Sequence, residues 1–327
     1  MNYYSSNDAD SSVLDGRNIV VLGYGNQGRP QALNLRDSGL KVSVAARRGG
    51  ESWQRAIDDG FRVVTLEEGA KEAQVLILLI PDEIQRDVFL DQIAGNLEYG
   101  SVLCFAHGFS VAFREIQTSD YVQVLVAPKG QGKRVREAYL EGSGLPCLIG
   151  VENDLYGDGM KVGLAIAEGL GCLRVGAFET TFKEEAVSDI FGEQAVLCGG
   201  VTGLVKCAFD TLVSKGFSPE VAYFECMHEL KILVDIFSRI GFSEMRKVIS
   251  TTAAYGGLRY GEALIDEETG SKMEKLFEFI DSGEFARDWL DKSAANRDFL
   301  VELREKESEL LIEKIGREIR SLFPENK

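Results

Sequence analysis

The stretch that decides the fold reads Ile19-Val20-Val21-Leu22-Gly23-Tyr24-Gly25-Asn26-Gln27-Gly28, and a helix-prone segment, residues 31–37, follows it. An apolar strand, a G-x-G-x-x-G turn and a helix in this order are typical of a dinucleotide-binding unit. In such a unit Gly23 permits the tight turn, Gly25 lets the pyrophosphate approach the backbone, and Gly28 allows the helix to pack closely on the strand. The phosphates lie at the positive end of the helix. We therefore expect a dinucleotide to bind at Gly23, Tyr24, Gly25, Asn26, Gln27 and Gly28.

The segment after the second expected strand indicates which dinucleotide binds. Sites for NAD usually place an acidic residue about twenty positions after the glycines, but this chain has Arg47 and Arg48 there. Guanidinium groups suit a 2′-phosphate, and Ser52 can donate one more hydrogen bond. Glu51 opposes this interpretation because a carboxylate would repel the phosphate. The sequence predicts NADP(H), with Glu51 as the contrary signal.

Strand-like and helix-like segments alternate as far as about residue 178. This alternation predicts an α/β fold with a doubly wound parallel sheet of the Rossmann type. Ligands of such a sheet lie beyond the carboxyl ends of its strands, where Pro81-Asp82, His107-Gly108 and Pro128-Lys129-Gly130 stand. The expected strands cover residues 18–23, 41–46, 61–65, 75–80, 101–106, 122–127, 145–151 and 172–177.

From Thr180 onward the apolar residues recur every three to four positions, which predicts an all-helical second half. The change of period places the boundary, so we expect a dinucleotide-binding domain at residues 1–180 and a helical domain at residues 181–327. The expected helices cover residues 194–215, 219–240, 242–252, 272–280 and 298–319.

Two pairs of acidic residues, Asp189 with Glu193 and Glu225 with Glu229, have a spacing that puts both side chains of a pair on one helix face. Each pair is mutually repulsive unless a cation lies between its members. Apolar neighbours surround both pairs, and a buried carboxylate must be paired or bind a metal. Oxygen ligands favour Mg²⁺ or Mn²⁺ over zinc. The alternative is that these acids form ordinary solvated helix faces.

The composition and charge of the chain limit which partners it could bind and where in the cell it could work. The formal net charge of −16 argues against nucleic acid and anionic membranes. The longest apolar run, Val75–Pro81, is far too short to span a membrane, and residues 1–10 do not resemble a signal peptide. We therefore expect a cytoplasmic protein with disorder only at its ends. Six cysteines in apolar contexts without a C-x-x-C pair suggest buried, reduced thiols.

Several ordered motifs give the chain a resemblance to short-form (class I) ketol-acid reductoisomerases. The matching segments include residues 23–39, 80–83, 105–109, 126–130, 179–185, 189–200, 222–231 and 282–286. The resemblance implies Mg²⁺-dependent alkyl migration in 2-acetolactate or 2-aceto-2-hydroxybutyrate, followed by reduction with NADPH, in valine and isoleucine biosynthesis. It also implies a knotted helical domain and a homodimer or a larger assembly of dimers.

The resemblance assigns roles to single residues. Asp189 and Glu193 would bind two Mg²⁺ together with Glu225 and Glu229 of a partner subunit, and Glu193 and Glu225 would also count as catalytic. Lys129 would supply positive charge near the metals. Two further assignments are a catalytic role for His107, for which a structural role at a strand end is an equal alternative, and substrate binding by Ser250. The predicted cofactor contacts are completed by Asp82, Gln85 and Gly132.

The chain also departs from the family pattern near these motifs, at Arg29, Pro30, Gln131, Lys133, Thr251 and Ala254. None of these changes removes an expected metal ligand. Three alternatives stay open: a divergent paralogue acting on another 2-hydroxy-3-keto acid, a metal-free dehydrogenase of the β-hydroxyacid type with Lys206 as its catalytic lysine, and a non-catalytic NADP(H)-binding regulator.

Overall fold

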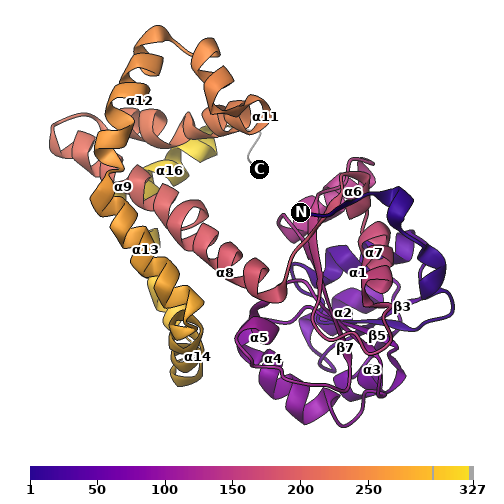
Figure 1. The fold of residues 1–327 in the computed structure, drawn as a ribbon. Coiled ribbons are helices and arrows are strands. Elements are labelled where there is room, and N and C mark those ends of the chain that lie inside the picture. Colours follow the sequence, from indigo (N-terminus) through magenta and orange to yellow (C-terminus); the bar gives the residue numbers. More distant parts are fainter. Residues whose placement is uncertain (297, 324–327) are drawn as a thin grey trace. The chain divides into compact units, whose positions relative to one another are not determined.

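The computed structural model describes residues 1–296 and 298–323 (Figure 1). The chain divides into two compact units, Met1–Ser188 and Asp189–Lys327. This division lies eight residues beyond the boundary expected from the sequence, because the helix that follows the last strand begins at Phe182 and continues to Gly192.

The first unit is built on one nine-stranded sheet with the order β1-β9-β8-β7-β6-β5-β2-β3-β4. Strand β2 lies between β3 and β5, both parallel to it, so the chain crosses over next to the glycine motif. The strands are β1 (Tyr3–Tyr4), β2 (Ile19–Leu22), β3 (Val42–Ala45), β4 (Val63–Val64), β5 (Val75–Leu78), β6 (Val102–Phe105), β7 (Val122–Pro128), β8 (Cys147–Val151) and β9 (Ala177–Glu179).

The side chains of β2 show how the sheet is covered. Ile19 and Val21 belong to one buried cluster, with apolar residues of the helices α1 and α7. Val20 and Leu22 belong to another, with residues of α3 and η3. Successive strand residues point to opposite faces, so each face has its own core, as in a doubly wound fold.

The helices of this unit are η1 (Ser6–Asp8), η2 (Ser11–Leu14), α1 (Gly28–Asp37), α2 (Glu51–Asp58), α3 (Leu66–Glu72), α4 (Asp82–Val88), η3 (Phe89–Ile93), α5 (Phe109–Ala112), α6 (Gly132–Leu140), α7 (Gly159–Gly169), η4 (Cys172–Arg174) and the start of α8 (Phe182–Gly192).

The Rossmann-type fold class is confirmed, but the sheet is mixed. Strand β8 runs antiparallel to β7, and β1 runs antiparallel to β9. The expected strand at residues 172–177 was wrong: Cys172 and Leu173 are buried in a short 3-10 helix, and β9 begins only at Ala177. The expected disorder at the N-terminus is also wrong, because β1 pairs with β9. The expected disorder at the C-terminal end, residues 324–327, lies outside the described residues.

The second unit is helical among its described residues. Its elements are η5 (Glu193–Leu197), α9 (Gly200–Ser214), α10 (Pro219–Tyr223), η6 (Phe224–His228), α11 (Leu230–Val248), α12 (Thr251–Leu264), α13 (Glu267–Asp281), α14 (Glu284–Ala295), α15 (Phe299–Ser308) and α16 (Leu311–Leu322). Its buried core joins α9, α10 and α16 through Phe209, Tyr223 and Ile315. The knot implied by the resemblance stays a prediction.

Helix boundaries in this unit differ from the expectation around residue 250. The expected break between residues 240 and 242 is present, because Gly241 has a φ of 80°. The expected helix 242–252 instead ends at Val248, and Ser250 starts α12 by accepting a hydrogen bond from Ala253 N at 3.1 Å. Three glycines inside α12 weaken its helical signal in the sequence. The expectation of buried cysteines also fails here, since Cys198 and Cys207 are exposed.

Candidate active site

The glycine-rich turn has the space that a dinucleotide needs. Gly23 has a φ of +99°, and a Cβ there would lie 2.6 Å from the carbonyl oxygen of Leu79. A Cβ on Gly28 would lie 2.1 Å from the carbonyl oxygen of Gly23, so α1 could not approach the strand with any larger residue. A Cβ on Gly25 would meet nothing within 4 Å. The turn is thus closely packed on its inner side and open at Gly25, where a pyrophosphate would approach the backbone.

The start of α6 completes this side of the turn. Gly132 is buried, and a Cβ on it would lie 1.7 Å from the carbonyl oxygen of Asn26. Gln27 donates a hydrogen bond from Nε2 to the carbonyl oxygen of Gly130 at 3.1 Å. The expected cofactor residues Asn26, Gln27 and Gly132 are therefore brought together by direct contacts between two loops.

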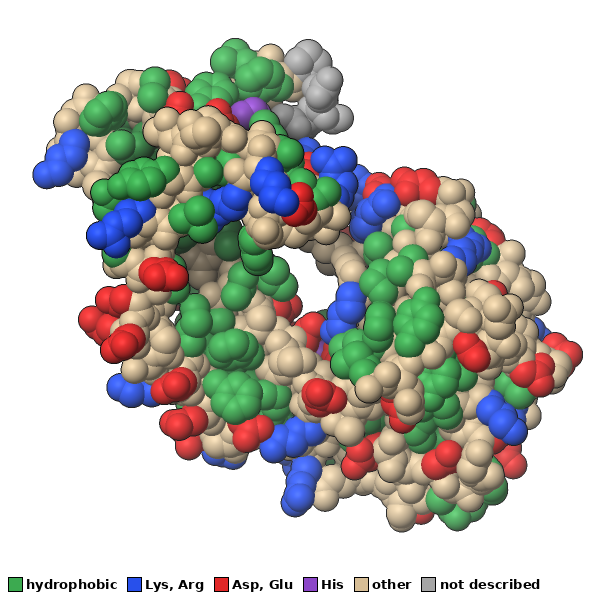
Figure 2. Space-filling model, turned by 45° about the horizontal axis from the view of Figure 1, so that its top comes forward, with side chains coloured by type: hydrophobic (Ala, Val, Ile, Leu, Met, Phe, Trp, Pro, Cys, Tyr) green, Lys and Arg blue, Asp and Glu red, His purple; other side chains and the backbone are tan. Residues whose placement is uncertain are grey.

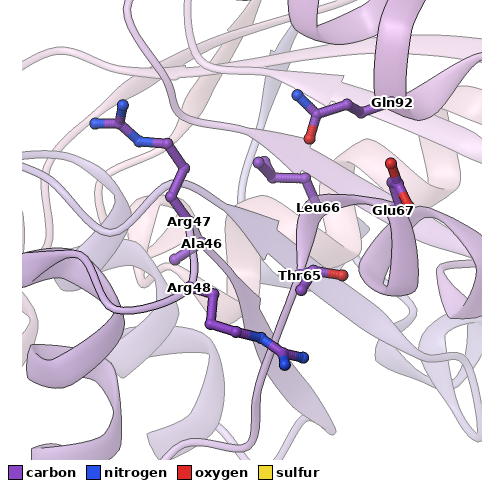
Figure 3. Close-up of a pocket in the computed structure, with 7 residues that line it drawn as sticks. All are labelled: Ala46, Arg47, Arg48, Thr65, Leu66, Glu67 and Gln92. Carbon is purple, nitrogen blue, oxygen red and sulfur yellow. The ribbon is translucent and has the colours of Figure 1, made fainter.

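Two of the expected 2′-phosphate residues, Arg47 and Arg48, line a pocket of about 300 Å³ beyond β3 (Figure 3), and the third, Ser52, is not one of its lining residues. Arg47 and Arg48 are both exposed, and their guanidinium groups point in different directions. Arg48 lies 3.9 Å from Glu68 and 5.8 Å from the ring of Trp53. The pocket is lined by Ala46, Arg47, Arg48, Thr65, Leu66, Glu67 and Gln92.

Two more of the expected cofactor residues lie at the start of α4. Gln85 is buried and donates from Nε2 to the carbonyl oxygen of Ile80 and to Oδ1 of Asp82, each at 3.0 Å. Its Oε1 accepts a hydrogen bond from Ser110 Oγ at 2.8 Å. Because all of these partners belong to the protein, Gln85 shapes this strand end by holding neighbouring groups.

A buried carboxylate joins the two strand-end residues His107 and Lys129. Glu185, on the first turns of α8, accepts a hydrogen bond from Lys129 Nζ through Oε1 at 2.7 Å. Its Oε2 lies 3.0 Å from Nδ1 of His107 and accepts a bond from Gly108 N at 2.7 Å. The first unit thus contains a linked set of a lysine, a carboxylate and a histidine, at the edge where parallel sheets bind ligands.

The electrostatics of this set keep Glu185 ionised. Burial would raise the pKa of this carboxyl, but the hydrogen bond and charge of His107 and the charge and hydrogen bond of Lys129 outweigh it. Together they lower its pKa to about 2. Because the carboxylate is charged at neutral pH, it can hold the cationic Lys129 and orient the imidazole of His107.

Asp189 follows Glu185 by four residues on α8. One ligand atom each of His107, Glu185 and Asp189 lie within 4.8 Å of one another. An imidazole and two carboxylates are donors that divalent cations accept. This donor set therefore fits a divalent cation. Among the described residues, Glu193, Glu225 and Glu229 are not members of this cluster.

The other expected metal ligands lie at irregular helix turns. Glu193 opens the π-helical segment η5, and its carbonyl oxygen accepts a bond from Cys198 N at 2.8 Å. Glu225 lies in the π-helical segment η6, and Glu229 follows it directly. All three side chains are exposed, so the burial expected from their apolar neighbours is wrong for these three acids. Single π turns inside helices are frequent at functional sites, so the local backbone at both acid pairs differs from that of an ordinary solvated helix.

Two further residues have clear positions within the second unit. Ser250 is exposed, and its hydroxyl caps α12. Lys206, the residue required by the dehydrogenase alternative, forms an ion pair with Glu307 on α15. This pairing does not favour Lys206 as a catalytic base.

Sequence reasoning missed Glu185 as a functional residue. It lies between Phe182 and Val187, both buried, and the charged run Lys183-Glu184-Glu185 suggests a solvated helix start. The available signal was the apolar surroundings of the acid, because a buried carboxylate needs partners.

Comparisons with known proteins cover both units. Residues 13–176 match the family described as "Acetohydroxy acid isomeroreductase, NADPH-binding domain", and residues 182–325 match "Ketol-acid reductoisomerase, C-terminal domain". The chain is 47% identical over 323 residues, 98% of each chain, to a ketol-acid reductoisomerase (NADP(+)) of Methanothermobacter thermautotrophicus.

The solved structures agree with this result. An NADH-preferring ketol-acid reductoisomerase from an uncultured archaeon superposes with a TM-score of 0.95 at 40% identity, covering 99% of this chain and 100% of that one. A putative oxidoreductase from Jannaschia sp. has a TM-score of 0.60 at 16% identity, covering 81% of this chain and 98% of that one, and shares the fold alone.

Proposed function

The chain belongs to the ketol-acid reductoisomerase family, and on that premise we propose how its own residues support the reaction. It is an NADP-dependent oxidoreductase with an isomerase step. In 2-acetolactate or 2-aceto-2-hydroxybutyrate an alkyl group migrates to the neighbouring carbonyl carbon, and the resulting keto acid is reduced to a 2,3-dihydroxy acid. The product leads to valine or isoleucine.

The observation that carries the proposal is the linked set of Lys129, Glu185 and His107 beside Asp189. The migration requires a hydroxyl group to lose its proton while a carbonyl oxygen gains negative charge. Lys129 would place its positive charge near those oxygens, and Glu185 would hold the lysine in position through the 2.7 Å bond. His107 would hold or move a proton at its imidazole, oriented by the 3.0 Å contact of Nδ1 with Glu185.

We assign two Mg²⁺ ions to the carboxylates of Asp189 and Glu193 together with Glu225 and Glu229. When bound, these ions would polarise the carbonyl and offset the charge on the deprotonated hydroxyl oxygen. Four carboxylates offer the oxygen ligands that Mg²⁺ prefers, and a ligand atom of Asp189 lies within 4.8 Å of His107 and Glu185 at the strand ends. Glu225 and Glu229 are exposed, which suits ligands that reach a shared site from another subunit. Ser250 would contact the substrate.

For the cofactor, we propose that the glycine turn cradles the pyrophosphate and that Arg47, Arg48 and Ser52 bind the 2′-phosphate. Gly25 is open, and the two arginines line the pocket beyond β3. Glu51, the first residue of α2, is exposed and can turn away from the phosphate. We therefore expect NADPH to be preferred, in contrast to the relative whose structure is described as NADH-preferring.

We further propose that the functional form is a homodimer or an assembly of dimers, with the helical domain as its interface. Many large apolar side chains of the second unit are exposed, among them Leu197, Phe242, Tyr255 and Leu264. Figure 2 shows hydrophobic side chains over much of the visible helical surface. The segment Phe182–Ser214 is long and apolar enough, by length and composition, to cross a membrane. Only 11% of its most apolar window is buried, so most of this apolar surface is uncovered in the single chain. A second copy of the chain would cover such surfaces and keep them from water.

The test is the Mg²⁺-dependent oxidation of NADPH in the presence of 2-acetolactate, measured as the loss of NADPH absorbance. Turnover that requires Mg²⁺ would support the proposal, and the same assay with 2-aceto-2-hydroxybutyrate gives the substrate preference. Binding of NADPH without turnover on either substrate would favour a non-catalytic regulator. Turnover only on another 2-hydroxy-3-keto acid would favour a divergent paralogue.

A further inference from the structure

Tyr24, the second residue of the glycine turn, is attached to both ends of α2. Its phenol hydroxyl donates to Oδ2 of Asp59 at 2.8 Å, and Asp59 is the C-cap of α2. Its carbonyl oxygen accepts a bond from Ser52 Oγ, in the first turn of the same helix, at 3.4 Å. Tyr24 is only 1% exposed, so this link runs through the interior of the first unit.

Asp59 also attaches α2 to α1. Arg29 donates from Nε to Oδ2 at 2.6 Å and from a terminal nitrogen to Oδ1 at 3.0 Å, which makes the ion pair bidentate. Arg36, further along α1, donates to the backbone carbonyl of Asp59 at 2.6 Å. Three side chains from the glycine turn and the helix that follows it therefore converge on one residue.

This arrangement differs from an ordinary surface ion pair. Exposed pairs typically contribute between zero and about 1 kcal/mol because water screens them and long side chains lose freedom. Here the Asp59 side chain is 19% exposed, whereas that of Arg29 is 46% exposed. Asp59 receives a parallel pair of bonds from Arg29 and also accepts a hydrogen bond from the hydroxyl of the buried Tyr24. Bidentate, charge-assisted bonds of this kind fix geometry as well as adding stability.

We propose that Asp59 is a positioning residue that sets the spacing between the two phosphate-binding parts of the cofactor site. The glycine turn receives the pyrophosphate, and the loop from Arg47 to Ser52 receives the 2′-phosphate. Both parts adjoin α2 or α1, and Asp59 holds these helices together through Tyr24 and Arg29. This inference rests on the proposed function of the loop from Arg47 to Ser52.

Asp59 acts at a distance from the cofactor. At a rise of 1.5 Å per residue, its backbone lies roughly 10 Å along α2 from that of Ser52. Loss of its side chain would let α2 shift relative to the glycine turn, and the contacts to the 2′-phosphate would weaken most. NADH lacks that phosphate, so its binding depends less on the spacing. The reacting atoms are not touched, so turnover at saturating cofactor should persist.

The experiment is a fluorescence titration of the full-length protein with NADPH and with NADH, without Mg²⁺ and without substrate. The variants are Asp59→Ala, Asp59→Asn, Tyr24→Phe and Arg29→Gln. We expect Asp59→Ala to raise the Kd for NADPH by about tenfold and that for NADH by about threefold or less, the scale of lost bonds to a charged group. The double variant Arg29→Gln with Asp59→Asn should lose less binding free energy for NADPH than the sum of the two single losses, because the two residues act as one unit.

The control is Asp158→Asn, which removes the 3.3 Å ion pair with Arg17 elsewhere in the same unit and should leave both Kd values unchanged. For Asp59→Ala, steady-state kinetics should show a higher KM for NADPH with kcat within about twofold of the unmodified enzyme, a split that a general loss of folding would not give. Thermal unfolding checks each variant, and Tyr24→Phe, which loses only one hydroxyl, carries the test if Asp59→Ala does not fold.

Two results would overturn the inference. Equal weakening of NADPH and NADH, or an NADPH preference that Asp59→Asn and Tyr24→Phe leave intact, would show that Asp59 does not set the spacing, while the proposed function would stand. An unmodified protein without any preference for NADPH would overturn this inference together with the assignment of the 2′-phosphate to the loop from Arg47 to Ser52.

Discussion

Glu185 and Lys129 lie 56 positions apart in the chain and form a 2.7 Å ion pair between Oε1 and Nζ. The side chain of Glu185 is only 1% exposed, whereas that of Lys129 is 33% exposed. The carboxylate thus anchors, from inside the first unit, a lysine whose side chain is partly exposed at the strand end. Because the same carboxylate contacts His107, it links both of the strand-end residues to which we assign catalytic work.

Replacing Glu185 with Gln should lower kcat by about 10²-fold, the scale of losing one aligned electrostatic group. The amide is nearly isosteric but neutral, so Lys129 and His107 lose their anchor while the packing persists. The measurement is steady-state turnover with 2-acetolactate. The matched control is Glu184→Gln, an exposed neighbour that accepts a bond from Thr180. Similar kcat values for the two variants would contradict a special role for Glu185.

Glu185 should also make stability depend on pH. Its folded-state pKa of about 2 lies below the ordinary value of 4.5. A depressed pKa stabilises the folded state fully above the unfolded value and loses this effect as the pH falls through the folded value. In metal-free protein, the Tm difference between wild type and Glu185→Gln should stay constant above about pH 5 and shrink as the pH falls from about 4.5 toward 2. A Tm difference between the two proteins that grows as the pH falls would contradict a stabilising role of the ionised Glu185 carboxylate.

The strand, turn and helix around the glycine motif were predictable from the sequence. Ile19, Val20, Val21 and Leu22 are all fully buried, and a strand buried on both faces reads as a continuous apolar run. The direction of β8 was not predictable in this way, because an apolar strand carries no signal of whether it pairs parallel or antiparallel.

The candidate site was predictable only where a motif carried it. His107 and Lys129 follow apolar strands, so their place at the sheet edge could be expected. For Glu185 the apolar surroundings indicated a need for partners, but its acidic neighbour resembles a solvated face. The partners themselves lie 56 and 78 positions away and could not be identified from the sequence. Asp59 was missed for the same reason: its partners Tyr24 and Arg29 become neighbours only after α1 and α2 pack together.

Asp189→Asn and Glu225→Gln should each lower turnover by at least about 10³-fold, since several kcal/mol of charge stabilisation would be lost with the metals. Binding of NADPH, measured by fluorescence, should stay near normal because both residues lie far from the glycine turn in sequence. Asp210→Asn, a change on α9 outside the proposed site, serves as the control. Full activity of the first two variants at saturating Mg²⁺ would contradict the metal assignment.

The cofactor preference tests the opposing signals in the loop after β3. Charge-assisted bonds to a phosphate contribute roughly 1.5–3 kcal/mol each, so kcat/KM should be higher with NADPH than with NADH. Arg47→Ala or Ser52→Asp should narrow or reverse the difference, and Glu51→Ser should widen it. A clear NADH preference of the unmodified enzyme would mean that Glu51 accepts the ribose hydroxyls of the cofactor.

Sharing of the metal site between subunits can be tested by complementation. If Asp189 and Glu193 act with Glu225 and Glu229 of the partner subunit, a heterodimer of Asp189→Asn and Glu225→Gln has one site with both defects and one site with neither. Mixing the two inactive variants should then restore activity, up to about one quarter of the wild-type value, since half of random dimers are mixed and half of their sites are intact. Subunit exchange is confirmed by differently tagged chains purified in tandem. Tandem-purified heterodimers without activity would show that the four acids do not combine across subunits, because every ligand set would then lie within a single mutated chain.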